Sequence, residues 1–314
     1  MTRRTKAPEK ASEEAQVKAQ AKASEKAQAG SCAEGRPAGR PAGRLRGEPL
    51  LVLGAVLTAL VVATCLVSLV WTPYDPTAMN VSERFAAPSL THLLGTDQFG
   101  RDILSRAMVA SQPALLVGLG SVALGSAAGI AVGLVAGMGN RVVNAVLMRV
   151  PDALMAFPGI LLAMGLVIVL GSGLQSALIA IAVFTVPTFA RLTCQTTLEI
   201  KGSLFIKAAR SNGCRGVNLV VRHVLPHIAP RLATQFTASA GSAMLLEAAL
   251  SFLGLGVQPP MASWGYMLSE AFAYVLVYPG LAVAPGLALM VAVLGFNLLG
   301  DGLNDWLVRR EAGR

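Results

Sequence analysis

The stretch Ser203–Pro226, with the sequence SLFIKAARSNGCRGVNLVVRHVLP, is a polar island between long apolar runs. Ser203 suits the N-cap of a helix, and the residues Leu204–Ser211 have good helix-forming character. Gly213 stands where such a helix stops. A second short amphipathic run follows, and Pro226 is expected to end it. The stretch therefore predicts two short helices with a glycine break between them.

The same stretch is strongly basic. A single acid lies nearby, Glu199, against five cations: Lys201, Lys207, Arg210, Arg215 and Arg222. Loops between membrane spans that carry an excess of Lys and Arg lie on the cytoplasmic side of the membrane. We therefore expect a short cytoplasmic element whose movement is linked to that of the rest of the chain.

The composition indicates an integral membrane protein. Of the 314 residues, 54% are hydrophobic and only 14% are charged, and the mean hydropathy is +0.60. A soluble domain carries about 25% charged residues, and the apolar residues here gather in runs of about 20, the length that spans a bilayer as a helix. The net charge of +9 does not indicate nucleic-acid binding, because the Lys and Arg residues are concentrated in the N-terminal tail and in loops.

Six apolar spans with both termini in the cytoplasm satisfy the charge bias of every loop. The inverted topology would place the seven cations of 191–231 outside. We therefore predict an all-α integral membrane fold with six transmembrane helices. They are expected at about Leu50–Trp71, Pro113–Met138, Ala153–Leu170, Leu174–Leu192, Pro230–Leu255 and Tyr278–Leu299.

The spans divide the chain into regions. The N-terminal region is low in complexity, contains the linker GRPAGRPAGR and has no apolar stripe to bury, so we expect a disordered cytoplasmic tail. The predicted regions are the tail 1–48, a first transmembrane helix 49–71, an external loop 72–112, a transmembrane domain 113–305 with a cytoplasmic loop 193–229, and a cytoplasmic C-terminal tail 306–314.

Local features refine the spans. A short basic turn at 139–149 is expected to lie inside, and Pro158 is expected to kink the third span. Trp264, in the external loop 256–277, is expected at the membrane interface. A strip of glycines on one face of the second span allows a neighbouring helix to approach closely: Gly125, Gly129, Gly133 and Gly137.

No catalytic constellation is visible in the sequence. The chain has no phosphate-binding loop of the form G-x-x-x-x-G-K-[ST], no H-E-x-x-H zinc motif and no G-x-S-x-G nucleophile turn. Its four cysteines and three histidines are scattered without metal-like spacing. We expect no cofactor, no bound metal and no enzymatic activity, so work against a gradient takes its energy from ions or from a partner that hydrolyses nucleotide.

One ionisable residue lies inside a predicted span. Glu247, in the fifth span, is a candidate functional group because charges inside membranes are costly and mark functional sites. Three interpretations stay open: a group on a translocation path that binds a cationic substrate, a proton site, or a buried strut that is hydrogen-bonded to a neighbouring helix. A single carboxylate does not form a proton relay.

The basic stretch resembles a known signature. KAARSNG, nine residues and HVLP follow the register of the cytoplasmic signature of binding-protein-dependent ABC importer permeases, which is Glu-Ala-Ala, three residues, Gly, nine residues, Ile, one residue and Leu-Pro. Lys207 stands in place of the Glu and His223 in place of the Ile. The matching positions are Ala208, Ala209, Gly213, Leu225 and Pro226.

The resemblance extends over about 70–314. HLLGTDQFGRDILSR (His92–Arg106), Met148–Pro158, EAALSFLGLGVQPP (Glu247–Pro260) and FNLLGDGLND (Phe296–Asp305) are similar to the C-type permease of dipeptide, oligopeptide and nickel importers. This resemblance implies a multi-pass protein of the bacterial inner membrane with a type I ABC importer permease (MetI-like) fold and a cytoplasmic coupling helix.

The resemblance also implies partner subunits. In this family the loop forms a coupling helix that docks in a groove of a cytoplasmic ATP-binding subunit. Two such subunits, a second permease and an extracytoplasmic solute-binding protein complete the importer. Ala208 and Ala209 would be small enough for close docking, and Gly216 would repeat the helix stop. The external loops 72–112 and 256–277 would face the binding protein.

The leading interpretation is a non-enzymatic permease subunit for short peptides, driven by ATP hydrolysis on separate subunits. Nickel or another small solute is an alternative within the same class. An ion-coupled secondary transporter or a channel would work without an ATPase. A membrane enzyme would need a nucleophile, a metal or an acid–base cluster, and the sequence offers none.

Overall fold

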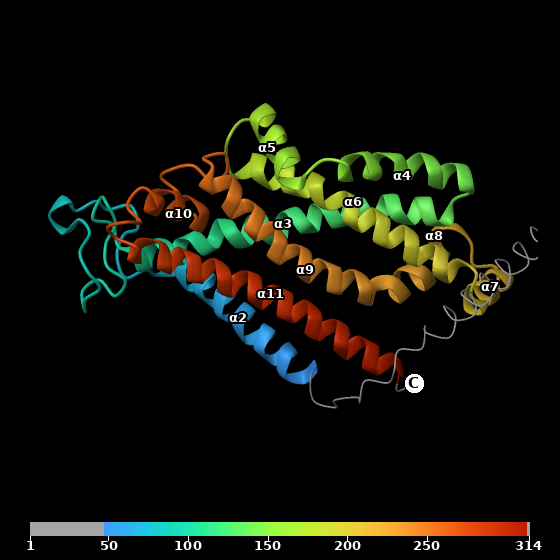
Figure 1. Ribbon diagram of the computed structural model, residues 1–314. Coiled ribbons are helices and arrows are strands. Elements are labelled where there is room, and N and C mark those ends of the chain that lie inside the picture. The colour runs from blue at the N-terminus through green and yellow to red at the C-terminus, as the bar shows by residue number, and fades with distance from the viewer. Residues whose placement is uncertain (1–46, 313–314) are drawn as a thin grey trace, which may run out of the picture. The chain divides into compact units, whose positions relative to one another are not determined.

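A computed structural model describes residues 47–312 and consists of helices joined by turns and one longer segment (Figure 1). Within this range the β-type pairing is limited to an isolated bridge between Thr96 and Asp102, so the all-α prediction is confirmed. The elements are α2 (Gly47–Val70), η1 (Val81–Glu83), α3 (Ile103–Met138), α4 (Arg141–Met155), α5 (Gly159–Leu170), α6 (Leu174–Lys201), α7 (Leu204–Ser211), α8 (Gly216–Leu219), η2 (Val220–Val224), α9 (Leu225–Phe252), α10 (Trp264–Phe272) and α11 (Gly280–Ala312).

Four of these helices, α2, α3, α6 and α11, contain a stretch long and apolar enough to cross a membrane. The pair α4 and α5 adds a fifth candidate if it is counted as one span, and its two helices are bent by 91°. The 28 residues of α9 make a helix about 42 Å long, but α9 does not qualify by composition. The count of six spans therefore stays a prediction.

The glycine strip on α3 packs against α6. A methyl group at Gly125 would lie 2.5 Å from the carbonyl oxygen of Ala182, and one at Gly133 would lie 2.5 Å from that of Ala190. Real side-chain carbons do not approach backbone oxygens so closely, so the two helices meet at a distance that only glycine permits. The predicted close approach is confirmed, and its partner is α6.

A second close pair joins the two ends of the described chain. A methyl group at Gly54 of α2 would lie 2.3 Å from the backbone nitrogen of Leu299, and one at Gly302 of α11 would lie 2.5 Å from the Cα of Leu51. Because the start of α2 meets the C-terminal part of α11, these two helices run antiparallel. The sequence analysis did not identify this pair, since its glycines are not spaced as a strip.

The region of the third span differs from the prediction. Instead of a basic turn at 139–149, Asn140 caps a helix by accepting a hydrogen bond from the backbone N–H of Val143 at 2.9 Å, and α4 then runs to Met155. The span Ala153–Leu170 is predicted as one helix with a kink at Pro158; the chain does bend there, but by 91°, so two separate helices stand in place of one. Pro158 lies at the N-cap of α5; proline has no N–H to donate and disfavours helical geometry in the residue before it.

Three other helices are longer than expected. The helix α3 begins ten residues before Pro113, because the Asp102 carboxylate accepts a hydrogen bond from the N–H of Ser105 and caps it there. The helix α6 continues beyond Leu192 to Lys201. The helix α11 runs through most of the predicted C-terminal tail 306–314. The predicted disordered tail lies outside the described residues except for its last two, which begin α2.

Trp264 corrects the expectation of an interfacial aromatic residue. It is only 2% exposed, and its Nε1 donates a hydrogen bond to the backbone oxygen of Ala107 at 2.9 Å. The next residue, Gly265, lies so close to α9 that a methyl group there would be 2.0 Å from the carbonyl oxygen of Ala248. The predicted external loop therefore contains a helix, α10, whose buried face, with Trp264, Gly265, Met267 and Ala271, packs mainly against α9 and α11 and also touches α3.

The close approach of α3 and α6 makes a first prediction. The variant Gly133→Ala should lower the free energy of unfolding by about 1–3 kcal/mol, because the added methyl group meets backbone and must push the helices apart. The matched control is Gly165→Ala, since no atom lies within 4 Å of a methyl group at that position; it should change stability by less than about 1 kcal/mol. Unfolding of the purified protein in mixed detergent micelles measures both, and equal effects would contradict the proposed packing.

Candidate coupling loop, buried carboxylate and outer charge network

The first helix of the basic stretch forms where the sequence predicts it. The helix α7 spans Leu204–Ser211 with Ser203 at its N-cap. The Ser203 hydroxyl makes no capping bond and instead donates to the backbone oxygen of Ile200 at 2.6 Å. Gly213 ends the helix with φ of +83°, and Gly216 follows with φ of +55°. The predicted stop at Gly213 is confirmed, whereas Gly216, which was expected to repeat it, is the first residue of α8; positive φ favours glycine at both positions.

The two faces of α7 have different surroundings. Ile206 is fully buried and Ala209 is 7% exposed, and both belong to the hydrophobic cluster that contains Leu219 and Val224 of the returning chain. Ala208 is exposed on the other face. The two alanines therefore have different surroundings: Ala209 packs on its own chain, whereas Ala208 faces away from it.

Further side chains of α7 are exposed on the same face as Ala208, which is called the free face of α7. Leu204 is 83% exposed and Phe205 is 40% exposed. Lys207 is also exposed, and its ammonium group has no ion-pair partner among the described residues. The free face of α7 thus presents apolar groups, a small residue and a positive charge without an ion-pair partner.

The return from the loop corrects the prediction for Pro226. The chain does not break there, because α8, the π-helical turn η2 and α9 follow one another without a gap, and Pro226 lies in the first turn of α9. The N–H of Leu225 donates to the oxygen of Val220 across this wide turn. A π turn is a rare local feature that adjusts the register of a helix, and here it immediately precedes a residue with no N–H. His223, in the turn, is half-buried.

Lys201 fixes the start of the loop to α3. Its ammonium group donates to the backbone oxygens of Gly137, Met138 and Gly139 at 3.1, 2.9 and 2.7 Å. These oxygens belong to the end of α3, where the helix dipole favours a cation. The sequence analysis counted Lys201 only as one positive charge of the loop. Its position at the last residue of a helix was the signal that it could cap a neighbouring one.

Glu247 is completely buried within α9. Its Oε1 accepts a hydrogen bond from the Ser251 hydroxyl at 2.7 Å, and that hydroxyl oxygen accepts one from the N–H of Val257 at 3.0 Å. Its Oε2 has no hydrogen-bond partner among the described residues. This arrangement differs from the predicted strut to a neighbouring helix, because Glu247 bonds within α9 and reaches only the turn beyond that helix, through Ser251. In this conformation Glu247 does not line an open path, and contact with a substrate stays a prediction.

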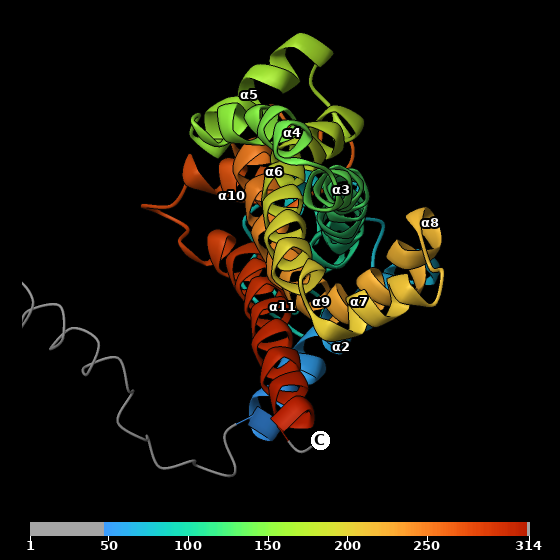
Figure 2. The same cartoon turned by 90° about the vertical axis from the view of Figure 1, so that its right-hand side faces the viewer.

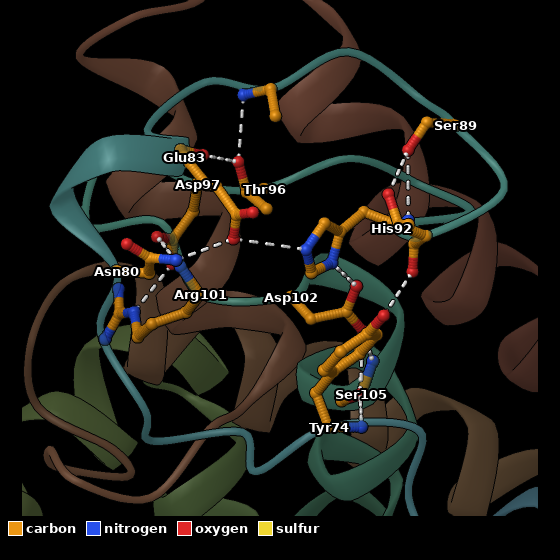
Figure 3. A network of polar contacts seen from close by, with 12 residues as sticks. Tyr74, Asn80, Glu83, Ser89, His92, Thr96, Asp97, Arg101, Asp102 and Ser105 are labelled. Atoms are coloured by element: carbon orange, nitrogen blue, oxygen red, sulfur yellow. Dashed lines mark hydrogen bonds and ion pairs between the residues drawn. The ribbon is translucent and has the colours of Figure 1, made fainter.

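A charge network at the end of the described unit opposite α7 (Figure 1) was not predicted; it is called the outer charge network here because its segment 72–112 is predicted to lie outside. Figure 3 shows the His92 ring between two acids. Its Nδ1 lies 2.9 Å from Asp102 and its Nε2 lies 3.5 Å from Glu83. The other oxygen of Asp102 accepts a hydrogen bond from the hydroxyl of Ser105 at 2.7 Å, and Ser105 in turn accepts one from the N–H of Tyr74 at 3.0 Å. The segment before α3 is therefore folded onto the start of that helix.

Two arginines and two acids form the centre of this network. Arg101 donates to Asp97 at 2.6 Å and to Glu270 of α10 at 2.7 Å. Arg106 contacts the same two carboxylates, at 2.7 Å to Glu270. The four side chains are between 4% and 12% exposed. They join α10 to a segment that is more than 160 residues away in sequence.

The charges of this group balance one another. Burial works to lower the pKa of Arg101, but the hydrogen bond to Glu270 and the charge of Asp97 together raise this pKa above its ordinary value. The segment 72–112 carries four acids and three arginines, so its charges nearly cancel. The spacing of four between Asp97 and Arg101 was a further signal of a pair, but nothing in the sequence linked them to Glu270.

Comparison with known proteins identifies the family. Residues 129–313 match the family described as the binding-protein-dependent transport system inner membrane component. The chain belongs to this family. It is thus an inner-membrane, multi-pass permease component of a binding-protein-dependent transport system, as the resemblance of its basic stretch predicted. The family consists of transport permeases rather than of enzymes.

Similar proteins share most of their length with this permease. The glutathione transport system permease protein GsiD of Pectobacterium atrosepticum is 42% identical over 236 residues, which cover 75% of this chain and 78% of that protein. Proteins of the same name from Escherichia coli and Shigella boydii are each 45% identical over 220 residues, or 70% of this chain and 73% of theirs.

The outer charge network makes a second prediction. Arg106→Met should cost about 3–5 kcal/mol of unfolding free energy, because it leaves two nearly buried carboxylates short of a partner. The control Arg191→Met breaks an ion pair to Asp152 of 2.5 Å whose side chains are about half exposed, and it should cost about 0–1 kcal/mol. Unfolding in mixed micelles compares the two variants. A loss at Arg106 no larger than that at Arg191 would contradict the proposed role of the network.

Proposed function

We propose that this permease forms, with a second permease subunit, the path by which short peptides enter the cell. An external solute-binding protein delivers the peptide, and two cytoplasmic ATP-binding subunits drive transport. The chain itself carries no catalytic role. Its contribution is to change conformation when the ATP-binding subunits push on its basic loop.

The observation that carries this proposal is the geometry of α7. This short helix lies between the contact of Lys201 with α3 and the junction with α9. One of its faces packs on its own chain through Ile206 and Ala209, and the other face is free. Such a helix moves as a rigid piece when a partner presses on its free face. The partner is an ATP-binding subunit, and its docking groove should contain an acid opposite Lys207, where this chain departs from the family's acid.

The loop passes motion on through its second connection. The helix α7 packs on the returning chain, which runs through η2 into α9 without a break. Leu225 and Pro226 stand at that junction, and His223 lies in the turn just before it. A push on α7 therefore reaches α9 directly, whereas Lys201 holds the other end of the loop to α3. The residues at the signature positions thus have different roles and do not form one contact surface. Ala209 supports α7 on its own chain, His223 lies in the turn, and Leu225 and Pro226 join that turn to α9.

The two ends of the described residues carry different elements, and this difference supports one orientation of the protein in the membrane. The segment 71–102 and α10 lie at one end, and α7 and α8 lie at the other, together with the end of α11 (Figure 1). The start of α2 also lies at the latter end, because it packs against the C-terminal part of α11. We assign this end to the cytoplasm, since it carries the basic loop. The outer charge network then faces the solute-binding protein.

Short peptides are the substrate class that the relatives favour. These relatives are named as glutathione transport system permeases, and glutathione is a tripeptide. Nickel or another small solute stays an alternative of the sequence analysis, with no observation in its favour. An ion-coupled transporter would import its substrate without ATP, so a requirement for ATP separates it from the proposed importer.

The coupling role makes a third prediction. Gly213→Pro should abolish ATP-dependent peptide uptake in proteoliposomes that contain all the subunits, although the protein still inserts. Proline cannot adopt the φ of +83° found at Gly213, and it lacks the N–H that this residue donates to the oxygen of Arg210 at 3.0 Å. Deletion of Leu204–Gly213 should have the same effect.

The control for this prediction is Gly202→Ala. This glycine also lies in the loop, but it has ordinary φ of −88° and no atom within 4 Å of an added methyl group. Its uptake should stay within about twofold of the unmodified protein, as is usual for a surface substitution that disturbs no special geometry. Normal ATP-dependent uptake by the Gly213→Pro variant would refute the coupling role.

Glu247 makes a fourth prediction. If the carboxylate is a strut, Glu247→Gln keeps an oxygen that accepts from Ser251, and it should reduce the uptake of cationic and neutral peptides by the same factor. Glu247→Ala removes this acceptor and should lower the unfolding free energy by about 1–3 kcal/mol. Competition between a lysine-containing and an uncharged peptide of equal length measures the first effect. A selective loss of cationic peptides would assign Glu247 to the translocation path.

A further inference from the structure

A groove of about 900 Å³ lies between the last two turns of α3 and the turn that connects α7 to α8. Its size falls within the range of about 300–1,000 Å³ that is typical of sites for small molecules. Figure 2 shows α7 and α8 to one side of the α3–α6 pair. The walls are largely apolar and include Leu134, Val135, Met138, Val217, Leu219 and Val220.

Two cations line the same groove. Arg210 at the end of α7 and Arg215 just before α8 are both exposed, and neither has an ion-pair partner among the described residues. The nearest acid in the sequence, Glu199, is already paired with Arg231 at 2.7 Å. Lys201, the other cation near the end of α3, donates to backbone oxygens. The positive charge of the groove is therefore not compensated within the described chain.

The position of the groove indicates the kind of ligand. The helix α3 is long and apolar enough to cross a membrane, and the groove lies at its very end. The 36 residues of α3 make a helix about 54 Å long, which exceeds the hydrocarbon core of about 30 Å, so a helix of this length that crosses the bilayer reaches the headgroup region. A ligand that fits here combines an apolar chain with a negative charge, and anionic phospholipids have both. Basic pockets at the membrane surface between helices bind such headgroups.

We propose that the groove binds one anionic phospholipid, with an acyl chain along the α3 wall and the phosphate between Arg210 and Arg215. Free phosphate would use only the cations, and a neutral lipid would use only the walls. The lipid would hold the α7–α8 turn against the membrane surface. This inference goes beyond the proposed function, because it requires neither ATP nor a transported substrate.

Lipid retention by the purified full-length protein tests the proposal. Native mass spectrometry would compare phosphatidylglycerol with phosphatidylcholine of identical acyl chains. The unmodified protein should retain phosphatidylglycerol preferentially. The double variant Arg210→Gln/Arg215→Gln should retain about tenfold less of it or lower still, because each cation near an anionic headgroup contributes several-fold to binding.

Two further variants separate a defined site from general attraction. Arg149→Gln/Arg222→Gln removes the same charge from exposed positions outside the groove and should keep phosphatidylglycerol within about twofold of the unmodified level. Ala131→Trp, in the α3 wall, fills the groove without a change of charge and should reduce the retention of both lipids.

Four results would overturn the lipid site. The first two are unchanged retention in the Arg210→Gln/Arg215→Gln variant and an equal loss of lipid in the Arg149→Gln/Arg222→Gln variant. The third is displacement of the lipid by inorganic phosphate alone, and the fourth is loss of the lipid when the partner subunits assemble. The last would show that a protein segment occupies the groove. None of these measurements depends on uptake, so a failure of the coupling role would leave the lipid result intact.

Discussion

The close approach of α3 and α6 is the contact on which the rest of the structure depends. A strip of glycines removes every side chain from one face of α3, so the two backbones meet almost directly. In a membrane, where apolar surface gains little by leaving lipid, such close packing is a main source of helix association. The pair also determines where the basic loop begins, because the last residue of α6, Lys201, binds the end of α3.

This support makes the two connections of the basic loop unequal. Its first connection is held by α3 and α6 together. Its second passes through the π turn into α9, a helix that packs against α3, α6, α10 and α11. Displacement of α7 is therefore resisted on one side and transmitted on the other. The hydroxyl groups of Thr234, Thr237 and Ser242 in α9 donate to backbone oxygens of the same helix, so they need no partner from outside it.

The sequence predicted the features that depend on local chemistry. The bounds of α7, its glycine stop at Gly213 and the glycine strip follow from backbone geometry and helix periodicity. The misplaced features depend on partners distant in sequence: Trp264 is buried because α3 supplies an acceptor, and Arg106 is paired because α10 supplies Glu270. The prediction that Pro226 ends a helix was wrong for another reason. The nearby π turn allows the helix to continue through a residue that usually ends one.

The same long-range pairs explain why α9 and α10 should move as one piece. Gly265 allows α10 to lie against the backbone of α9 with no side chain between them, so a shift of α9 cannot leave α10 behind without opening a void. At its other side α10 is bound to Arg101 and Arg106, whose charges are costly to separate once they are buried. Under the proposed coupling, motion that starts at α7 would reach the opposite end of the unit through this packing. There it would meet a charge network that either moves with α10 and the segment before α3, or holds α10 in place.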